Sequence, residues 1–237
     1  MRYGRLRQRV MPRVLALSVA AAVAVARGGD PAGETILRNV EARLAAVHDY
    51  TVTLDVVADI ERLNVPPMHA TMYFKQPDKV HIDAEGFAML PREGLQPNVG
   101  KLLAKYAVAG VGRDTLDGSA VRTVTLQAKS DRSFPRSLTL YVNPERWTTE
   151  RIVTSGAADR RVTISYSYVQ VEGVWLPGGM TAAFTLAPPD SIGIDLPAGP
   201  LRPQQAPRNG TVTVRYSNYR LNTGLSDDLF AGEAPSR

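Results

Sequence analysis

From Tyr50 onward apolar and polar residues alternate along the chain, and this period of two constrains the fold more than any other feature. The first run places Val52, Leu54 and Val56 between polar residues. Similar runs recur as HATMYF, VTLQA, SLTLYV, RVTISYSYV, MTAAFTL and TVTVRYSNY, which gives about ten candidate strands. Strands with one apolar face and short turns indicate an antiparallel sheet with one face in water.

Residues 30–48 have helical spacing instead. Asp30 followed by Pro31 predicts an N-cap with proline at the first helical position. One apolar stripe follows at intervals of three and four residues: Ile36, Leu37, Val40, Leu44 and Val47. Glu41 and Arg43 fall off this stripe, so we expect them on a solvated face.

Two stretches break the rhythm of the strands. Residues 86–112 are apolar without alternating, and Leu102, Leu103 and Tyr106 predict a short helix. At the end of this stretch GVGRDT, residues 110–115, begins like a dinucleotide-binding fingerprint but lacks its third glycine, so we expect a loop there. Residues 187–209 hold six of the 17 prolines, which predicts a long irregular loop, either a functional lid or disordered.

The architecture follows from the single apolar face of the predicted sheet, which cannot remain open to water. One N-terminal helix and one short middle helix cover only part of such a face. The sequence therefore predicts a mainly β (α+β) fold: a curled antiparallel half-barrel of about ten strands, with the two helices plugging the concave apolar face. Sheets of this kind often enclose an apolar cavity, the usual place for a small ligand.

The segment MYFKQPDKVHI, residues 72–82, predicts a hairpin whose register can be inferred by matching apolar faces. Phe74 then lies opposite Val80, and Met72 opposite Ile82, because a slip of one residue would turn one apolar set toward water. In this register His81 faces Tyr73, and His69 is four residues further along the strand, roughly 13 Å away. The two histidines therefore cannot share a metal ion.

The first 26 residues are predicted to be a secretory signal peptide. Five arginines and no acid precede VLALSVAAAVAVA, an apolar run of 13 that is too short to cross a bilayer, and small-x-small cleavage sites lie at 22–24 and 24–26. We expect residues 27–237 to form a single exported domain. Without these five arginines the 28 Lys and Arg fall to 23, equal to the 23 Asp and Glu, so the mature chain carries no basic footprint for nucleic acid.

The chain offers little for catalysis. It has no cysteine, which excludes disulfides, thiolate metal sites and a lipid-modified N-terminal cysteine. It has only three histidines and no G-x-S-x-G turn. We therefore predict no enzyme activity, no catalytic or metal-binding residues and no cofactor.

The order of several segments resembles the LolA/LolB-type periplasmic carriers and the broader outer-membrane lipoprotein-sorting group. After the exported N-terminus and the capped helix DPAGETILRNVEARLAAV come DYTVTLDV, MYFKQPDKVHI, LYVNPERWTTERIV, YVQVEGVWLPGGM and YSNYRLNTGLSDDLF. The resemblance implies a half-barrel in which helices form a lid over a cavity for acyl chains. It also implies a periplasmic, non-lipidated carrier, with an inner- or outer-membrane partner for loading or unloading.

The predicted ligand-binding residues are those of the apolar face, with two leucines of the middle helix and one tryptophan at the mouth of the cavity: Val52, Leu54, Val56, Met72, Phe74, Val80, Ile82, Leu102, Leu103 and Trp175. A closed core without a void is the alternative for the aliphatic residues, and ordinary packing is the alternative for Trp175.

The resemblance has two departures. In the lipoprotein carrier an arginine precedes the proline of the hairpin turn and helps to hold the lid shut, whereas this chain has Gln76, whose amide lacks the fork of donors of a guanidinium. Residues 86–112 also lack the strand pair expected after the first hairpin. We therefore keep a second hypothesis, a non-enzymatic envelope sensor or interaction module on the same fold.

Overall fold

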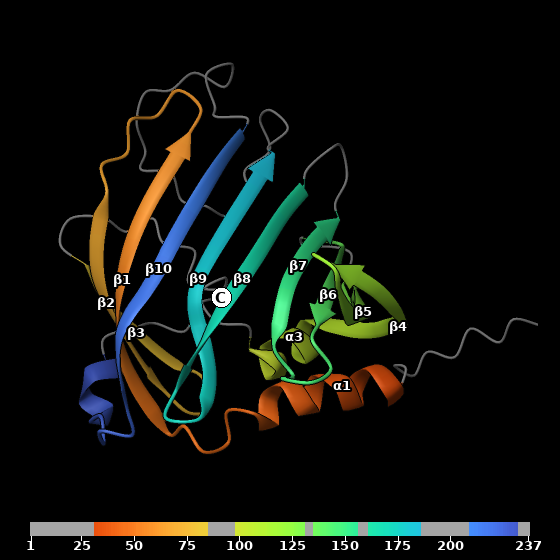
Figure 1. The fold of residues 1–237 in the computed structure, drawn as a ribbon, viewed down its shortest axis with the longest axis horizontal. Coiled ribbons are helices and arrows are strands. Elements are labelled where there is room, and N and C mark those ends of the chain that lie inside the picture. The colour runs from red at the N-terminus through yellow and green to blue at the C-terminus, as the bar shows by residue number, and fades with distance from the viewer. Residues whose placement is uncertain (1–30, 85–97, 131–134, 156–160, 186–208, 232–237) are drawn as a thin grey trace, which may run out of the picture.

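The computed structural model describes residues 31–84, 98–130, 135–155, 161–185 and 209–231. In this part of the chain ten strands form one open antiparallel sheet, in the order β3-β2-β1-β10-β9-β8-β7-β6-β5-β4 (Figure 1). The strands are β1 Asp49–Ile60, β2 Met68–Lys75, β3 Lys79–Ala84, β4 Tyr106–Leu116, β5 Ser119–Ala128, β6 Ser137–Val142, β7 Thr149–Ser155, β8 Arg161–Val171, β9 Val174–Thr185 and β10 Asn209–Leu221. The predicted mainly β sheet is confirmed.

Two α-helices, α1 Pro31–Ala42 and α3 Val99–Lys105, lie at one end of the curled sheet beside β4–β7 (Figure 1). Leu37 and Val40 of α1 and Val99 of α3 are buried in the same hydrophobic cluster as the strands. At Gly33 the helix backbone approaches β4 so closely that a Cβ atom would touch Val108 and lie 3.0 Å from Val111. The helices therefore cover the apolar face, and the predicted curled half-barrel with helices is confirmed.

The register inferred for the first hairpin is also confirmed. β2 pairs with β3 so that Met72 lies opposite Ile82 and Phe74 opposite Val80. Two other hairpins turn at Asp-Gly and Glu-Gly, where both residues have positive φ: 50° and 82° at Asp117 and Gly118, 48° and 82° at Glu172 and Gly173. Such turns match the twist of the flanking strands.

The prediction of a loop at GVGRDT is wrong, because these residues belong to β4, which pairs with β5. The expected strand pair is therefore present in this part of the chain. The register of the two strands shifts between Val108 and Gly110, so one extra residue interrupts the alternation. This bulge, at the edge of the sheet, explains why a search for period two missed the strand.

The first helix is shorter than predicted, since α1 ends at Ala42 and residues 43–46 form turns. The prediction that Arg43 lies on a solvated helical face is wrong, because Arg43 follows the end of the helix and is half-buried. β9 continues through the segment Leu-Pro-Gly-Gly, residues 176–179. The register with β8 shifts there, between Ser167 and Tyr168.

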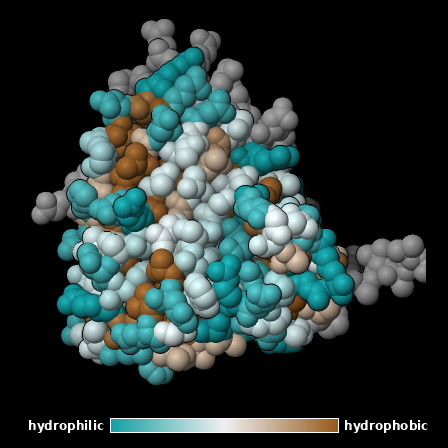
Figure 2. Space-filling view, viewed as in Figure 1, coloured by the Kyte–Doolittle hydropathy of each residue, from teal (hydrophilic) through white to brown (hydrophobic). Residues whose placement is uncertain are grey.

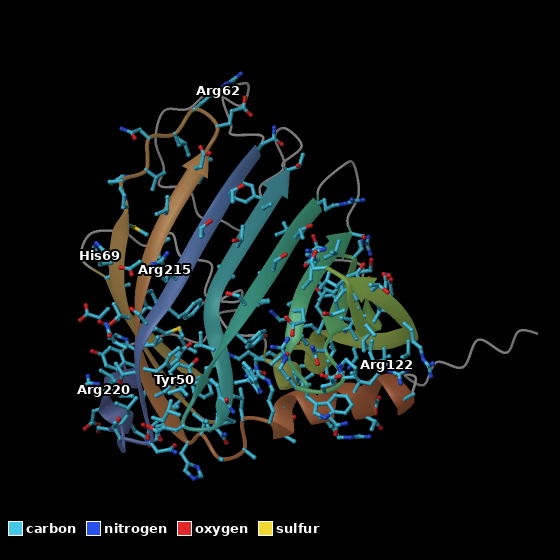
Figure 3. All side chains as sticks on the ribbon, in the orientation of Figure 1. Tyr50, Arg62, His69, Arg122, Arg215 and Arg220 are labelled. Atoms are coloured by element: carbon cyan, nitrogen blue, oxygen red, sulfur yellow. The ribbon has the colours of Figure 1, made fainter. Side chains whose placement is uncertain are left out.

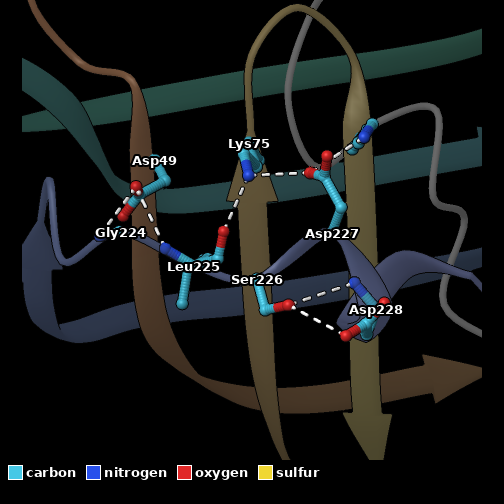
Figure 4. Close-up of polar contacts among 8 residues, drawn as sticks. Asp49, Lys75, Gly224, Leu225, Ser226, Asp227 and Asp228 are labelled. Carbon is cyan, nitrogen blue, oxygen red and sulfur yellow. Dashed lines mark hydrogen bonds and ion pairs between the residues drawn. The ribbon is translucent and has the colours of Figure 1, made fainter.

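The segment after β10 is fastened to the start of β1 by one buried carboxylate (Figure 4). Asp49, 4% exposed, accepts hydrogen bonds from the backbone N–H groups of Thr223 at 2.8 Å, Gly224 at 3.0 Å and Leu225 at 3.3 Å. The Thr223 hydroxyl donates a fourth at 3.2 Å. One aspartate thus satisfies three backbone donors of the residues that follow the last strand.

A short 3₁₀ helix, η2 Asp227–Phe230, then packs against the first hairpin. Ser226 caps it by accepting a hydrogen bond from the Asp228 N–H. The Asp227 carboxylate bridges Lys75 at 2.7 Å and Lys79 at 3.0 Å (Figure 4). Hydrogen bonds from both lysines lower the pKa of Asp227, whose side chain is largely exposed to solvent.

The predicted signal peptide and all of the proline-rich loop except Asn209 lie outside the described residues. Within the described ranges no helix combines the length and the apolar composition that a membrane span requires.

Candidate functional site

The predicted apolar site residues lie together on one face of the sheet. Five of them are at most 5% exposed: Val52, Leu54, Val56, Met72 and Phe74. Val80, Ile82, Leu102 and Leu103 are half-buried and pack against the same cluster. The structure thus brings nine of the ten residues into one continuous apolar layer. Their role in binding a ligand remains a prediction.

This layer is filled by its own side chains in the conformation described. An open hollow of about 490 Å³ instead lies where β1 and β9 end and where β8 and β10 begin. Seven of its ten lining residues are polar, and the lining includes a row that crosses four neighbouring strands: Thr163, Ala183, Thr211 and Asp59. These residues alternate with the buried ones, so the row lies on the outer face of the sheet, which is largely hydrophilic in the view of Figure 2.

Trp175, the tenth predicted residue, does not belong to the apolar layer. Its ring lies under the guanidinium of Arg146, with 4.9 Å between the guanidinium carbon and the ring centroid. Its backbone carbonyl accepts a hydrogen bond from Nη1 of Arg43. Trp175, at the start of β9, therefore contacts the turn between β6 and β7 through Arg146 and the turn after α1 through Arg43.

Next to the apolar layer is a group of aromatic side chains that we call the tyrosine cluster: Tyr50, Tyr166, Tyr168, Tyr216 and Tyr219. Tyr50, labelled in Figure 3 near the lower ends of the strands, stacks on Phe74 at 5.0 Å and meets Tyr219 edge-on at 5.5 Å. The rings of Tyr166 and Tyr168 are 6.4 Å apart. The cluster therefore continues the apolar layer through Phe74.

Burial raises the pKa of every tyrosine in the cluster above the ordinary value. The phenols consequently stay protonated at neutral pH and can donate hydrogen bonds. Two of them donate to backbone carbonyls: Tyr168 to Thr149 at 2.8 Å and Tyr219 to Pro177 at 2.8 Å.

Arg43 brings a positive charge to the tyrosine cluster. The carbon of its guanidinium lies 5.4 Å from the ring centroid of Tyr168, within the range of a cation–π contact. Its Nε is buried and has no hydrogen-bond acceptor. Burial also lowers the pKa of Arg43, against the opposing effect of the neighbouring tyrosines.

Gln76 fastens the turn of the first hairpin to the segment that follows α1. Its side-chain Nε2 donates to the carbonyls of Leu44 at 2.8 Å and Val47 at 2.7 Å, and its backbone N–H donates to the His48 carbonyl at 2.8 Å. The amide lacks a guanidinium, but it still makes two side-chain contacts between the hairpin turn and the end of the helical cover.

Replacing Gln76 by Met is expected to lower the free energy of unfolding by about 1–3 kcal/mol, because two carbonyls lose their donor. Chemical denaturation monitored by circular dichroism measures this change. Gln127→Met, at an exposed position of β5, is the matched control and should be close to neutral. Equal stability of the two variants would show that the Gln76 contacts do not hold the turn.

The histidines form no metal site. His69 contacts Asp55 at 2.5 Å on the outer face, and His81 lies beside Tyr73, with 5.8 Å between the ring centroids, as the inferred register predicts. Among the described residues no group of three or more His, Asp or Glu side chains is placed to hold a metal ion.

Sequence reasoning missed Arg43 and most of the tyrosine cluster. Tyr166, Tyr168 and Tyr216 could have been found, because they share the alternation of buried neighbours. Tyr219 could not: Asn218 has a φ of 55°, and the register between β1 and β10 shifts between Thr51 and Thr53. This irregularity turns Tyr219 inward, where simple alternation would place its neighbour.

The comparisons with known proteins are structural. No protein-family model and no curated protein matches the sequence. A DUF1329 family protein from Desulfovibrio piger aligns with a TM-score of 0.58 and 13% identity over 86% of this chain and 97% of its own. A putative outer membrane lipoprotein-sorting protein domain from Vibrio parahaemolyticus aligns with a TM-score of 0.59 and 12% identity, over 84% and 97%. The chain therefore has the LolA/LolB-type fold that its ordered segments resemble.

Proposed function

We propose that this protein is a periplasmic carrier that binds acyl chains of lipids or lipoproteins on its apolar face, for transfer toward the outer membrane. The observation that carries the proposal is the single apolar layer on one face of an open sheet, covered at one end by α1 and α3. An acyl chain that leaves water for such a layer gains about 0.8 kcal/mol per buried CH₂ group. Binding and release then need no chemical step.

The packing of the layer adds a requirement to this proposal. Val52 and Leu54 are 0% exposed, so a ligand can reach them only if the cover moves. The helices of the cover are held by the apolar packing of Leu37, Val40 and Val99, and the two hydrogen bonds from Gln76 fasten the segment that follows α1. We expect the cover to separate from the sheet while the strands keep their pairing.

Two measurements test the carrier function. Mass spectrometry of an organic extract of the native protein should identify a co-purified lipid. The delipidated protein should bind a fluorescent long-chain fatty acid saturably, with one binding site. Absence of both results would contradict the proposal. A stable protein partner captured by a protein without lipid would favour the sensor hypothesis instead.

A further inference from the structure

Arg43 is a half-buried cation, and none of the carboxylates in the described ranges forms an ion pair with it. Glu150, an acid whose charge raises the pKa of Arg43, is already engaged by Arg146 at 3.3 Å and by the Thr148 hydroxyl at 2.6 Å. Removing a guanidinium from water without an opposite charge is costly, so a compensating anion would stabilise this arrangement.

The hydrogen-bond donors of the Arg43 guanidinium are also incompletely used. A guanidinium carries five N–H groups. Arg43 gives one hydrogen bond, to the Trp175 carbonyl, rests its face on Tyr168 and leaves Nε buried without an acceptor. A planar donor group of this kind matches the two oxygens of a carboxylate or a phosphate.

The position of this donor group is suited to the end of an acyl chain. Tyr50 belongs to the tyrosine cluster and stacks on Phe74, at the lower end of the apolar layer. From Tyr50 to Val56 the layer follows β1 for six residues, roughly 20 Å at the usual rise per residue. An acyl chain laid along β1 would therefore bring its polar end to Arg43. Arg43 itself is only half-buried and lies in the turn after α1.

We propose that Arg43 binds the oxyanion at the end of an acyl ligand, either a carboxylate or a phosphate ester. This inference rests on the proposed carrier function and adds a ligand class to it: amphiphiles with a negative charge next to the acyl chain. Arg43 supplies the charge that selects the ligand.

The test compares ligands that share one acyl chain and differ in the head group. Oleate, oleyl alcohol and oleoyl lysophosphatidate compete with a fluorescent fatty alcohol for the delipidated protein, and inorganic phosphate is added alone as a fourth arm. We expect at least one of the two charged ligands to bind at least about tenfold more tightly than the alcohol. The charged arm that shows this preference identifies the oxyanion, and inorganic phosphate alone should not displace the probe.

Arg43→Met should abolish this preference by weakening the binding of the charged ligands much more than that of oleyl alcohol, whereas a purely structural role would weaken all ligands equally. Arg38→Met is the matched control, because the Arg38 side chain is 61% exposed on α1. Arg43→Lys keeps the positive charge without the planar set of N–H donors, so it should retain part of the preference. This variant provides the test if Arg43→Met does not fold.

The possible failures are distinguishable. Equal affinities of the unmodified protein for the charged ligands and the alcohol would overturn this inference and leave the carrier function intact. The same holds if the preference persists in Arg43→Met, or if inorganic phosphate alone displaces the probe as well as the charged ligands do. If no acyl ligand binds, the proposed function fails, and this inference fails with it.

Discussion

Asp49→Ala is expected to lower the free energy of unfolding by about 3–5 kcal/mol, because it leaves buried hydrogen-bond donors without an acceptor. The carboxylate accepts from three successive backbone N–H groups and one hydroxyl of the segment after β10. Water can replace it only if this segment separates from β1. Equilibrium denaturation by urea, followed by circular dichroism, measures the loss.

The matched control is Asp83→Ala, at an exposed position of β3, which should change stability by less than about 0.5 kcal/mol. Asp49→Asn removes the negative charge and keeps the shape of the side chain. It keeps one acceptor oxygen but turns an amide donor toward the backbone N–H groups, so it should also be destabilising. Two alanine variants of equal stability would show that the Asp49 contacts contribute little to the folded state.

Leu54→Ala should cost about 2–5 kcal/mol, the range for removing a fully buried leucine from a close-packed core. Leu54 is 0% exposed, and its neighbours across the strands are Ala70 on β2 and Tyr216 on β10. Because both strands are held by backbone ladders, the site cannot collapse fully and a cavity remains. Thermal and urea denaturation give the change in stability.

Val57→Ala is the control on the same strand, since Val57 faces outward and is 53% exposed. Its effect should stay within about 0.5 kcal/mol. If Leu54→Ala is as mild as Val57→Ala, the apolar face is not close-packed, and an acyl chain could enter without displacing the cover. The pair of variants therefore also tests whether the cover has to move before a ligand binds.

The sequence predicted best where a local pattern determines the structure. Alternation and turn residues predicted a sheet of about ten strands, and matching apolar faces predicted the register of Met72 with Ile82. The predictions failed where the pattern is interrupted. The bulge near Val108 concealed β4, and the early end of α1 moved Arg43 out of the helical face.

The site was predictable in its apolar part and not in its polar part. Val52, Leu54 and Val56 share one face because side chains alternate along a strand, a rule that needs only the sequence. The contact of Arg43 with Tyr168 and with the Trp175 carbonyl joins residues more than a hundred positions apart. Which carbonyl a turn arginine meets depends on how the sheet curls, and no local pattern contains that information.

The pairing of β1 with β10 has a consequence for how the protein is made. The first strand of the sheet pairs on one side with the last, and the N-terminal strands β1–β3 meet the strands β4–β9 only through β10. Nascent chain that lacks its C-terminal strand therefore holds two separate sheets with unpaired edges. Pairings so distant in sequence form slowly. Completion of the sheet must await β10, so the two parts of the sheet cannot join before this last strand has been synthesised.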